Sequence, residues 1–230
     1  MKPYFVKTPI LVPVLYRHQI WGFSSKQKNI YLTFDDGPTP RITDWVLDTL
    51  QKYNAGATFF CIGKNIEANP TLFNRIISDG HATGNHTYDH ENGWKTCKED
   101  YLASVLKTEK IIQKLKPESS NLDSHPHNYR DSKLLFRPPY GKMKKSQSKL
   151  LMDNDYTIIM WSVLSADFDV EIDENKCLNN VIENSNNGSI VVFHDSEKAY
   201  DKLQIVLPKV LEYFNEKGYA FRKIEESLII

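Results

Sequence analysis

The sequence predicts an α/β fold, a closed or nearly closed (β/α) barrel of about seven parallel strands. Seven short apolar segments alternate with segments of helical periodicity along the 230 residues. These apolar segments are continuous runs, as expected for parallel strands that are buried on both faces. Helical connections imply parallel neighbours joined by right-handed crossovers. An open doubly wound sheet is the alternative, but no glycine-rich phosphate loop follows the first strand.

Each strand is predicted from a run of apolar or β-branched residues that ends at a turn signal. The first strand, 30–34, ends before Asp35 and Asp36, and Gly37 and Pro38 then turn the chain. In a continuing strand, neighbouring side chains point to opposite faces, so two adjacent carboxylates share one site only at such a turn. The predicted strands are 30–34, 57–62, 81–85, 134–136, 156–161, 189–193 and 218–221.

Helices are predicted where apolar residues recur every three or four positions. The long helix at 96–116 is expected to bury one face, made of Tyr101, Leu102, Val105, Leu106, Ile111 and Ile112. The predicted helices are 40–53, 64–78 with a restart at Pro70, 96–116, 143–154, 173–184 and 200–216, the last bent at Pro208.

The chain is expected to form one domain over 30–230, with residues 1–29 as an irregular arm packed on the barrel. Prolines at positions 3, 9 and 13 argue against a helix in this arm. The apolar stretch 9–16 is short and lacks a cleavage site, so no signal peptide is recognised. This favours a cytoplasmic chain, or a mature or trimmed one. Residues 117–132 are polar and aperiodic, which predicts a loop with solvated His125 and His127.

Composition excludes several classes of partner. The formal net charge is +0, which gives no support for nucleic-acid binding. No run of about 20 apolar residues exists, so no insertion into a membrane is expected. The three cysteines, Cys61, Cys97 and Cys177, contain no CxxC pair, so neither a disulfide framework nor a cysteine zinc site is indicated.

Reactive side chains follow the predicted strands at their carboxyl ends. In a parallel barrel these ends lie on one rim, where such folds carry out their chemistry. The residues, in strand order, are Asp35 and Asp36, then His86 and His90, then Arg137 and Tyr140, then Asp167, then His194 and Asp195.

His86 and His90 are four residues apart, so on one helical turn both imidazoles would face the same side. With one carboxylate, Asp36 or Asp35, they make a site that suits Zn²⁺ or another first-row divalent ion. The second carboxylate could take a proton from water, and His194 could protonate a leaving group. This is a hydrolytic arrangement. Two exposed histidines on a helix are the alternative interpretation.

Five motifs give the chain a resemblance to a known family. They are TFDDG at 33–37, HTYDH at 86–90, RPPYG at 137–141, WSVLSADF at 161–168 and VFH at 192–194. In this order they resemble the polysaccharide deacetylases, carbohydrate esterase family four, with the chitooligosaccharide deacetylase homology domain. The resemblance covers about 160 residues, and its first three motifs are highly specific.

The resemblance implies a distorted (β/α) barrel and a metal-dependent deacetylase over 30–230. It implies Asp36, His86 and His90 as ligands of one divalent ion, Zn²⁺ first, with Co²⁺, Ni²⁺ or Mn²⁺ as alternatives. It implies Asp35 as catalytic base, His194 as general acid, Arg137 as the residue that orients the base and Asp167 as the partner of His194. Tyr140, through its backbone N–H, Trp161 and Phe168 are implied at the oxyanion and substrate.

The expected substrate is an acetylated carbohydrate, most often an N-acetylglucosamine polymer and in some members O-acetylated xylan, and the expected state is a monomer. Two departures bear on substrate preference: Phe168 stands where the family commonly has Trp, and Val192 where it has Leu. Family members also usually act outside the cytoplasm. The alternatives are a glycan-binding member without turnover, and a two-His, one-carboxylate Fe(II) oxygenase.

Overall fold

The computed structural model describes residues 4–23, 26–115, 134–225 and 228. Within them, eight strands form one sheet of order β5-β4-β3-β2-β1-β7-β6, and β8 pairs with β1 in addition. Every strand pair in this sheet is parallel. The strands are β1 Asn29–Asp35, β2 Ala57–Cys61, β3 Ala82–Asn85, β4 Leu134–Phe136, β5 Tyr156–Ile158, β6 Val163–Leu164, β7 Ser189–His194 and β8 Ala220–Phe221.

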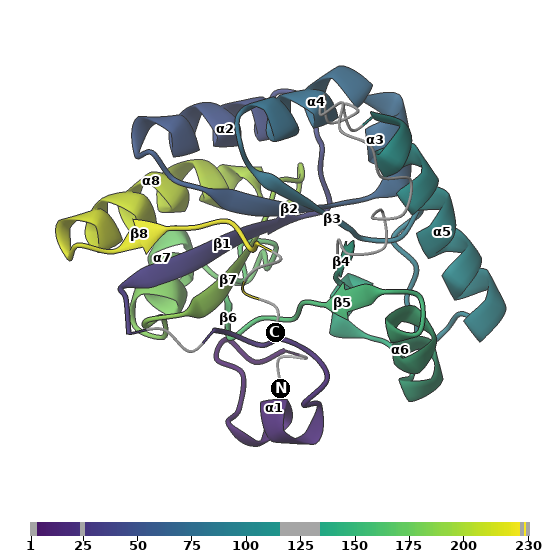
Figure 1. Cartoon of the computed structure of the whole chain (residues 1–230). Coiled ribbons are helices and arrows are strands. Elements are labelled where there is room, and N and C mark those ends of the chain that lie inside the picture. The colour runs from purple at the N-terminus through teal and green to yellow at the C-terminus, as the bar shows by residue number, and fades with distance from the viewer. Residues whose placement is uncertain (1–3, 24–25, 116–133, 226–227, 229–230) are drawn as a thin grey trace, which may run out of the picture.

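Helices surround the sheet on its outer side, with α2 to α5 over the β1–β3 side and α7 and α8 along β6 and β7 (Figure 1). Their periodic apolar faces pack on the strands, as in other helix-covered parallel sheets. The helices are α1 Leu11–Leu15, α2 Ile42–Lys52, α3 Gly63–Ala68, α4 Pro70–Ser78, α5 Lys98–Leu115, α6 Lys145–Met152, α7 Glu174–Ile182 and α8 Tyr200–Glu216, with a short 3₁₀ turn η1 at Pro139–Gly141.

The sheet curls because its two edge strands are consecutive in the chain. β5 ends at Ile158 and β6 begins at Val163, so only the residues 159–162 join the two edges of the sheet. An extended chain advances at most about 3.6 Å per residue, so these edges must approach each other. The curled parallel sheet confirms the predicted (β/α) barrel.

The predicted strand 156–161 is wrong in its second half. The strand β5 ends at Ile158; the Ile159 N–H still donates to the Phe136 carbonyl of β4 at 2.8 Å, the Met160 N–H donates instead to the Ile20 carbonyl, and a separate two-residue strand, β6, follows. The sequence does not show where β5 ends, because Ile159 and Met160 are apolar and buried just as the strand residues before them are. Periodicity cannot show where a buried run crosses from one side of a barrel to the other.

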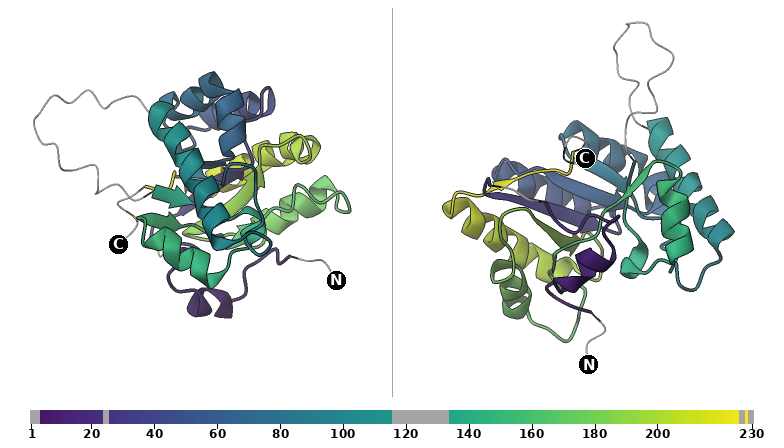
Figure 2. Two further views of the ribbon diagram at one scale, coloured as in Figure 1. Left: turned by 90° about the vertical axis from the view of Figure 1, so that its right-hand side faces the viewer. Right: turned by 60° about the horizontal axis from the view of Figure 1, so that its bottom comes forward.

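The N-terminal segment, residues 4–23, lies between the two sheet edges (Figure 2). Lys7 pairs with Val163 of β6, Ile20 pairs with Ile159, and Gly22 pairs with Ser189 of β7. The segment contains the one-turn helix α1, which the prolines had argued against. Pro13 is tolerated there because it lies in the first turn, where its missing N–H has no helical partner to lose.

The interior is filled from both faces of the sheet. The larger cluster lies between the outer helices and the strands, with Phe34, Phe59 and Phe193 stacked at its centre. On α5 the prediction is wrong for Leu106, which is exposed, whereas Ser104, Thr108 and Glu109 are buried instead. Of these, Ser104 faces the loop after β3 and accepts the Tyr88 N–H at 2.8 Å, whereas Glu109 lies beside the Tyr156 hydroxyl of β5.

The loop predicted at 117–132, with His125 and His127, lies outside the described residues. Elsewhere, no described helix combines the length and apolar character needed to cross a bilayer.

Candidate active site and metal centre

Asp35 and Asp36 leave β1 at its carboxyl end in different directions. Asp35 still pairs in the sheet, opposite Phe60 and His194. Asp36 adopts the left-handed region with φ of 82°, which turns its side chain away from the strand. Such a conformation is unusual for a residue other than glycine and is often found at functional sites. The turn therefore directs the two adjacent carboxylates to different places in the site.

The side chain of Asp195 holds this turn in place through two hydrogen bonds. Its Oδ1 accepts the Gly37 N–H at 3.0 Å, and its Oδ2 accepts the Thr43 hydroxyl at 2.5 Å. A Cβ on Gly37 would lie 2.0 Å from Asp195 Oδ2, so only glycine fits. Burial, above all, raises the pKa of Asp195 to about 8. The sequence predicted Asp195 at the rim but gave it no role. In the structure it anchors this turn.

His86 and His90 are brought together by a tight loop, and the expected helical turn at 86–90 is wrong. The residues after Asn85 form no helix, and Thr87 and His90 have φ of 65° and 58°. Asn85, fully buried, accepts the Thr87 N–H through its side chain and so shapes the loop. The ring centroids of His86 and His90 end 5.1 Å apart.

Three side chains converge on one point: Asp36, His86 and His90. Asp36 Oδ1 lies 3.7 Å from His86 Nε2 and 3.2 Å from His90 Nε2. Their donor atoms all lie within 4.8 Å of one another, and among the described residues no other group of three such side chains does so. Four ligands held tetrahedrally about 2.1 Å from a zinc ion lie about 3.4 Å from one another.

These residues fit a divalent cation. Asp36 Oδ1 is buried and has no hydrogen-bond partner, an expensive state for a carboxylate oxygen unless a cation binds it. His86 Nδ1 donates to the Arg137 carbonyl at 2.7 Å, which leaves the Nε2 lone pair facing Asp36. Burial lowers the pKa of His86 to about 4, so its ring is neutral as a metal ligand must be.

Arg137 is fully buried against Asp35. Its Nη1 donates to Asp35 Oδ1 and to Thr33 Oγ1, both at 2.7 Å, and Nε and Nη2 donate to the carbonyls of Ile159 and Met160. Burial on its own raises the pKa of Asp35, but the charge of Arg137, with smaller effects from His86 and His194, holds that pKa below its ordinary value. Asp35 is thus held as an ionised carboxylate, hydrogen-bonded to Arg137.

Asp167 clamps His194 through two hydrogen bonds. One carboxylate oxygen accepts the His194 backbone N–H at 2.7 Å, and the other lies 2.8 Å from Nδ1 of its ring. Asp167 is fully buried. Burial on its own lowers the pKa of His194, but the Asp167 carboxylate outweighs it and raises this pKa to about 10. The imidazole is therefore held protonated, with Nε2 left for the pocket.

These groups face one pocket of about 430 Å³ at the carboxyl ends of the strands. Tyr140, Trp161 and Phe168 line it, and Arg137 and Asp167 lie directly behind it. Tyr140 has φ of 59° and its hydroxyl lies 3.1 Å from His90 Nδ1. Phe168 meets the His194 ring edge-on at 5.1 Å. The structure brings together all ten residues that the family resemblance implies, with the eleventh rim residue, Asp195, behind the Asp36–Gly37 turn.

Sequence reasoning missed several lining residues. Tyr4 reaches the pocket from the N-terminal segment, packs edge-on against Phe168 at 5.6 Å and donates its hydroxyl to Asp169. Lys142 and Lys198 also line it. Nothing in the sequence links Tyr4 to the motifs, because its position depends on the pairing of the N-terminal segment. Thr33 had a signal, since it is the polar residue within an apolar strand.

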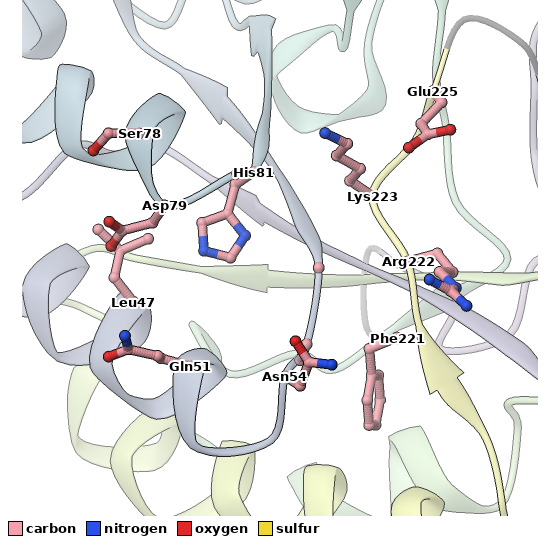
Figure 3. A pocket seen from close by; sticks show the side chains of 13 residues that line it. Leu47, Gln51, Asn54, Ser78, Asp79, His81, Phe221, Arg222, Lys223 and Glu225 are labelled. Atoms are coloured by element: carbon pink, nitrogen blue, oxygen red, sulfur yellow. The ribbon is translucent and has the colours of Figure 1, made fainter.

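A second pocket, of about 490 Å³, opens at the other end of the sheet between α2, the α4–β3 turn and the segment after β8 (Figure 3). His81 faces it, and its Nδ1 accepts the Ala57 N–H at 3.2 Å. Burial lowers the pKa of His81 to about 4. Reactive groups do not converge here, and barrels of this kind place their chemistry at the opposite, carboxyl end.

A family model described as "Polysaccharide deacetylase" matches residues 24–159 of this chain. The chain belongs to the polysaccharide deacetylase family. Its match includes the aspartate pair, the two histidines and Arg137. The sequence-based assignment to this family is therefore confirmed.

Relatives of this polysaccharide deacetylase support the assignment over most of the chain. Two peptidoglycan-N-acetylglucosamine deacetylases of Bacillus cereus are 33% and 32% identical, covering 84% and 90% of this chain. This chain spans 65% of the first relative and 92% of the second. A chitooligosaccharide deacetylase of Azorhizobium caulinodans is 31% identical over 75% of this chain and 76% of its own length.

Solved structures show the same fold. A crystal structure of a peptidoglycan N-acetylglucosamine deacetylase superposes with a TM-score of 0.81 at 30% identity, covering 94% of this chain and 95% of the other. A family pseudoenzyme of Bacillus anthracis has the same fold, with a TM-score of 0.76 at 22% identity over 91% of this chain and 68% of its own. Because the fold occurs with and without activity, the function rests on the residues of the pocket.

Proposed function

We propose that this polysaccharide deacetylase hydrolyses acetamide groups of an N-acetylated carbohydrate, an oligo- or polysaccharide that contains N-acetylglucosamine, and releases acetate. The observation that carries this proposal is the convergence of Asp36, His86 and His90 between a buried carboxylate, Asp35, and a protonated imidazole, His194. The named activities of the relatives agree with it. O-acetylated carbohydrate is a second substrate class for the same chemistry.

Asp36, His86 and His90 would hold one divalent cation. Zn²⁺ is the first choice for two imidazoles and a carboxylate, with Co²⁺, Ni²⁺ and Mn²⁺ as alternatives. Such an ion supplies Lewis-acid polarisation of a carbonyl and lowers the pKa of water bound to it. The neutral His86 ring and the orphaned Asp36 oxygen support this assignment.

Asp35 and His194 carry out the two proton transfers of the proposed reaction, and the Tyr140 backbone stabilises the charge that develops between them. Asp35, a buried carboxylate oriented by Arg137, takes a proton from the attacking water. The backbone N–H of Tyr140 donates to the oxygen that becomes negative as the acetyl carbon turns tetrahedral. His194, held protonated by Asp167, donates its Nε2 proton to the departing amine nitrogen. The products are acetate and a free amino sugar.

All of these groups come from one chain, which supports a monomer as the working unit. Trp161 and Phe168 line the pocket beside His194 and are proposed to contact the acetyl group and the sugar. Phe168 leaves more room in the pocket than the tryptophan that the family commonly carries, so this position bears on which sugar fits.

An acetate-release screen tests the proposal. Metal-stripped protein and protein restored with each divalent metal would be incubated with chitooligosaccharides, peptidoglycan and acetylxylan. Release of acetate that depends on metal supports a deacetylase. Binding of a glycan without acetate release, with every metal, would support a glycan-binding member without turnover. Iron content with oxygen consumption would support the oxygenase alternative instead.

A further inference from the structure

Trp94 presents a large apolar ring to solvent beside the catalytic pocket. It is 60% exposed and lies in the segment between β3 and α5, four residues after His90. Lys142 lines the pocket, and its Nζ lies 5.2 Å from the centroid of the Trp94 ring. Trp94 therefore continues the wall that Tyr140, Gly141 and Lys142 form.

The backbone that carries this ring is fixed. The Gly93 N–H donates to the Lys142 carbonyl at 3.1 Å, and Nε2 of the fully buried Gln147 donates to the carbonyls of Gly93 and Thr96 at 3.0 and 3.2 Å. A Cβ on Gly93 would lie 2.5 Å from the Lys142 carbonyl oxygen, so this close approach requires glycine. An exposed ring on a rigid turn is preorganised for binding, because little freedom remains to be lost.

The chemistry of this surface suits a sugar. Large exposed apolar groups next to a polar pocket mark interaction sites, since folding otherwise removes such area from water. A flat indole offers the apolar C–H face of a pyranose ring a contact of matching shape. The Lys142 ammonium beside it can donate up to three hydrogen bonds to hydroxyl or carboxylate oxygens. Tyr140, 59% exposed, adds a second ring on the His90 side.

We infer that Trp94 and Lys142 form a subsite for a neighbouring sugar residue of the glycan whose acetyl group lies between Asp35 and His194. The inference rests on the proposed function and deepens it, because it assigns two residues of this chain to a sugar next to the one that loses its acetyl group. Trp94 determines affinity for the chain, and the groups of the pocket determine the chemistry.

The test compares a long and a small acetyl substrate. Trp94→Ala should raise KM for an N-acetylglucosamine pentamer at least tenfold while changing its kcat less than twofold. The loss of kcat/KM for 4-nitrophenyl acetate, which carries no sugar, should be at least ten times smaller than the loss for the pentamer. Trp94→Phe should restore most of the affinity. Tyr16→Ala, at an exposed aromatic directly after α1 and outside the pocket, is the matched control and should match wild type.

Equal losses of kcat/KM on both substrates, or an unchanged KM for the pentamer, would overturn the inference. If the wild-type protein releases no acetate from the pentamer, the proposed function is in question but the subsite is still measurable. Pentamer binding by Asp35→Asn would then be compared with binding by the double variant Asp35→Asn, Trp94→Ala, using calorimetry. Equal affinity of the two, or no binding by either, overturns the subsite.

Discussion

Arg137 Nη1 lies 2.7 Å from Asp35 Oδ1, with the guanidinium completely buried. The carbonyl of the same residue accepts the Nδ1 proton of His86. One residue therefore orients the proposed base through its side chain and a proposed metal ligand through its backbone. The side-chain role and the backbone role can be separated by substitution, because only the first depends on the side chain.

The two adjacent aspartates should respond differently to the same substitution. Asp35→Asn should lower deacetylation by about 10²–10⁴-fold and keep metal content near one per chain, because Asp35 is proposed as a base and not as a ligand. Asp36→Asn should lose metal. Metal analysis after dialysis, paired with acetate release, separates the two. Loss of metal from Asp35→Asn would show that the roles are assigned the wrong way round.

Arg137→Lys should destabilise the protein strongly even though charge is kept. Lysine cannot reproduce the planar fork that contacts Asp35, Thr33 and two backbone carbonyls. Each buried hydroxyl or carbonyl oxygen left without a donor costs about 1–3 kcal/mol in the free energy of unfolding, to be measured by urea unfolding. Arg41→Lys is the control, because Arg41 pairs with Glu197 at the surface, where ion pairs contribute about 0–1 kcal/mol. Similar losses in both variants would contradict the role of Arg137.

Asp167→Asn should move the alkaline limit of activity downward. His194 must carry a proton to act as an acid, and its pKa of about 10 keeps it protonated through neutral pH. Without the Asp167 charge and hydrogen bond, burial lowers the pKa of the ring and only the charges of Asp36 and Asp35 oppose it, so the pKa falls and the proton is lost at a lower pH. The pH profile of kcat/KM measures this shift. Asp201→Asn, an exposed change on α8, should leave the profile unchanged, and a fixed alkaline limb in Asp167→Asn would refute the general-acid role.

His81 should make the fold sensitive to acid. Its pKa is about 4 in the folded protein and about 6.5 when unfolded, so the unfolded chain binds more protons between these values. The free energy of unfolding should therefore fall as pH drops from about 6.5 to about 4, by up to roughly 3 kcal/mol from this residue. His81→Gln should flatten this dependence in urea titrations at pH 7.5, 6 and 4.5. His18→Gln, at an exposed position, serves as the comparison.

The parts of the site that the sequence predicts are those that follow from one local rule. A parallel strand delivers the residues after its last apolar position to a common rim, and this rule places Asp35, Asp36, His86, Arg137 and His194. The predicted barrel is also confirmed. It could be predicted because strands buried on both faces of a parallel sheet are continuous apolar runs in the sequence. The catalytic and metal-binding roles of these residues stay predictions until variants are measured.

The parts that the sequence does not predict depend on contacts between distant segments or on backbone angles. Tyr4 enters the pocket only because the N-terminal segment pairs with β6. His86 and His90 meet through left-handed residues at Thr87 and His90, whereas their spacing alone suggested a helix. The burial of Glu109 in place of Leu106 overrides the apolar pattern, because Glu109 lies beside the Tyr156 hydroxyl of β5.

The position of Tyr4 has a practical consequence for protein engineering. Because Tyr4 lines the catalytic pocket, trimming the chain to a minimal domain that begins at β1 would remove part of the wall of that pocket. Weak turnover measured with such a shortened protein would then reflect the missing Tyr4 side chain as much as the chemistry of the remaining site.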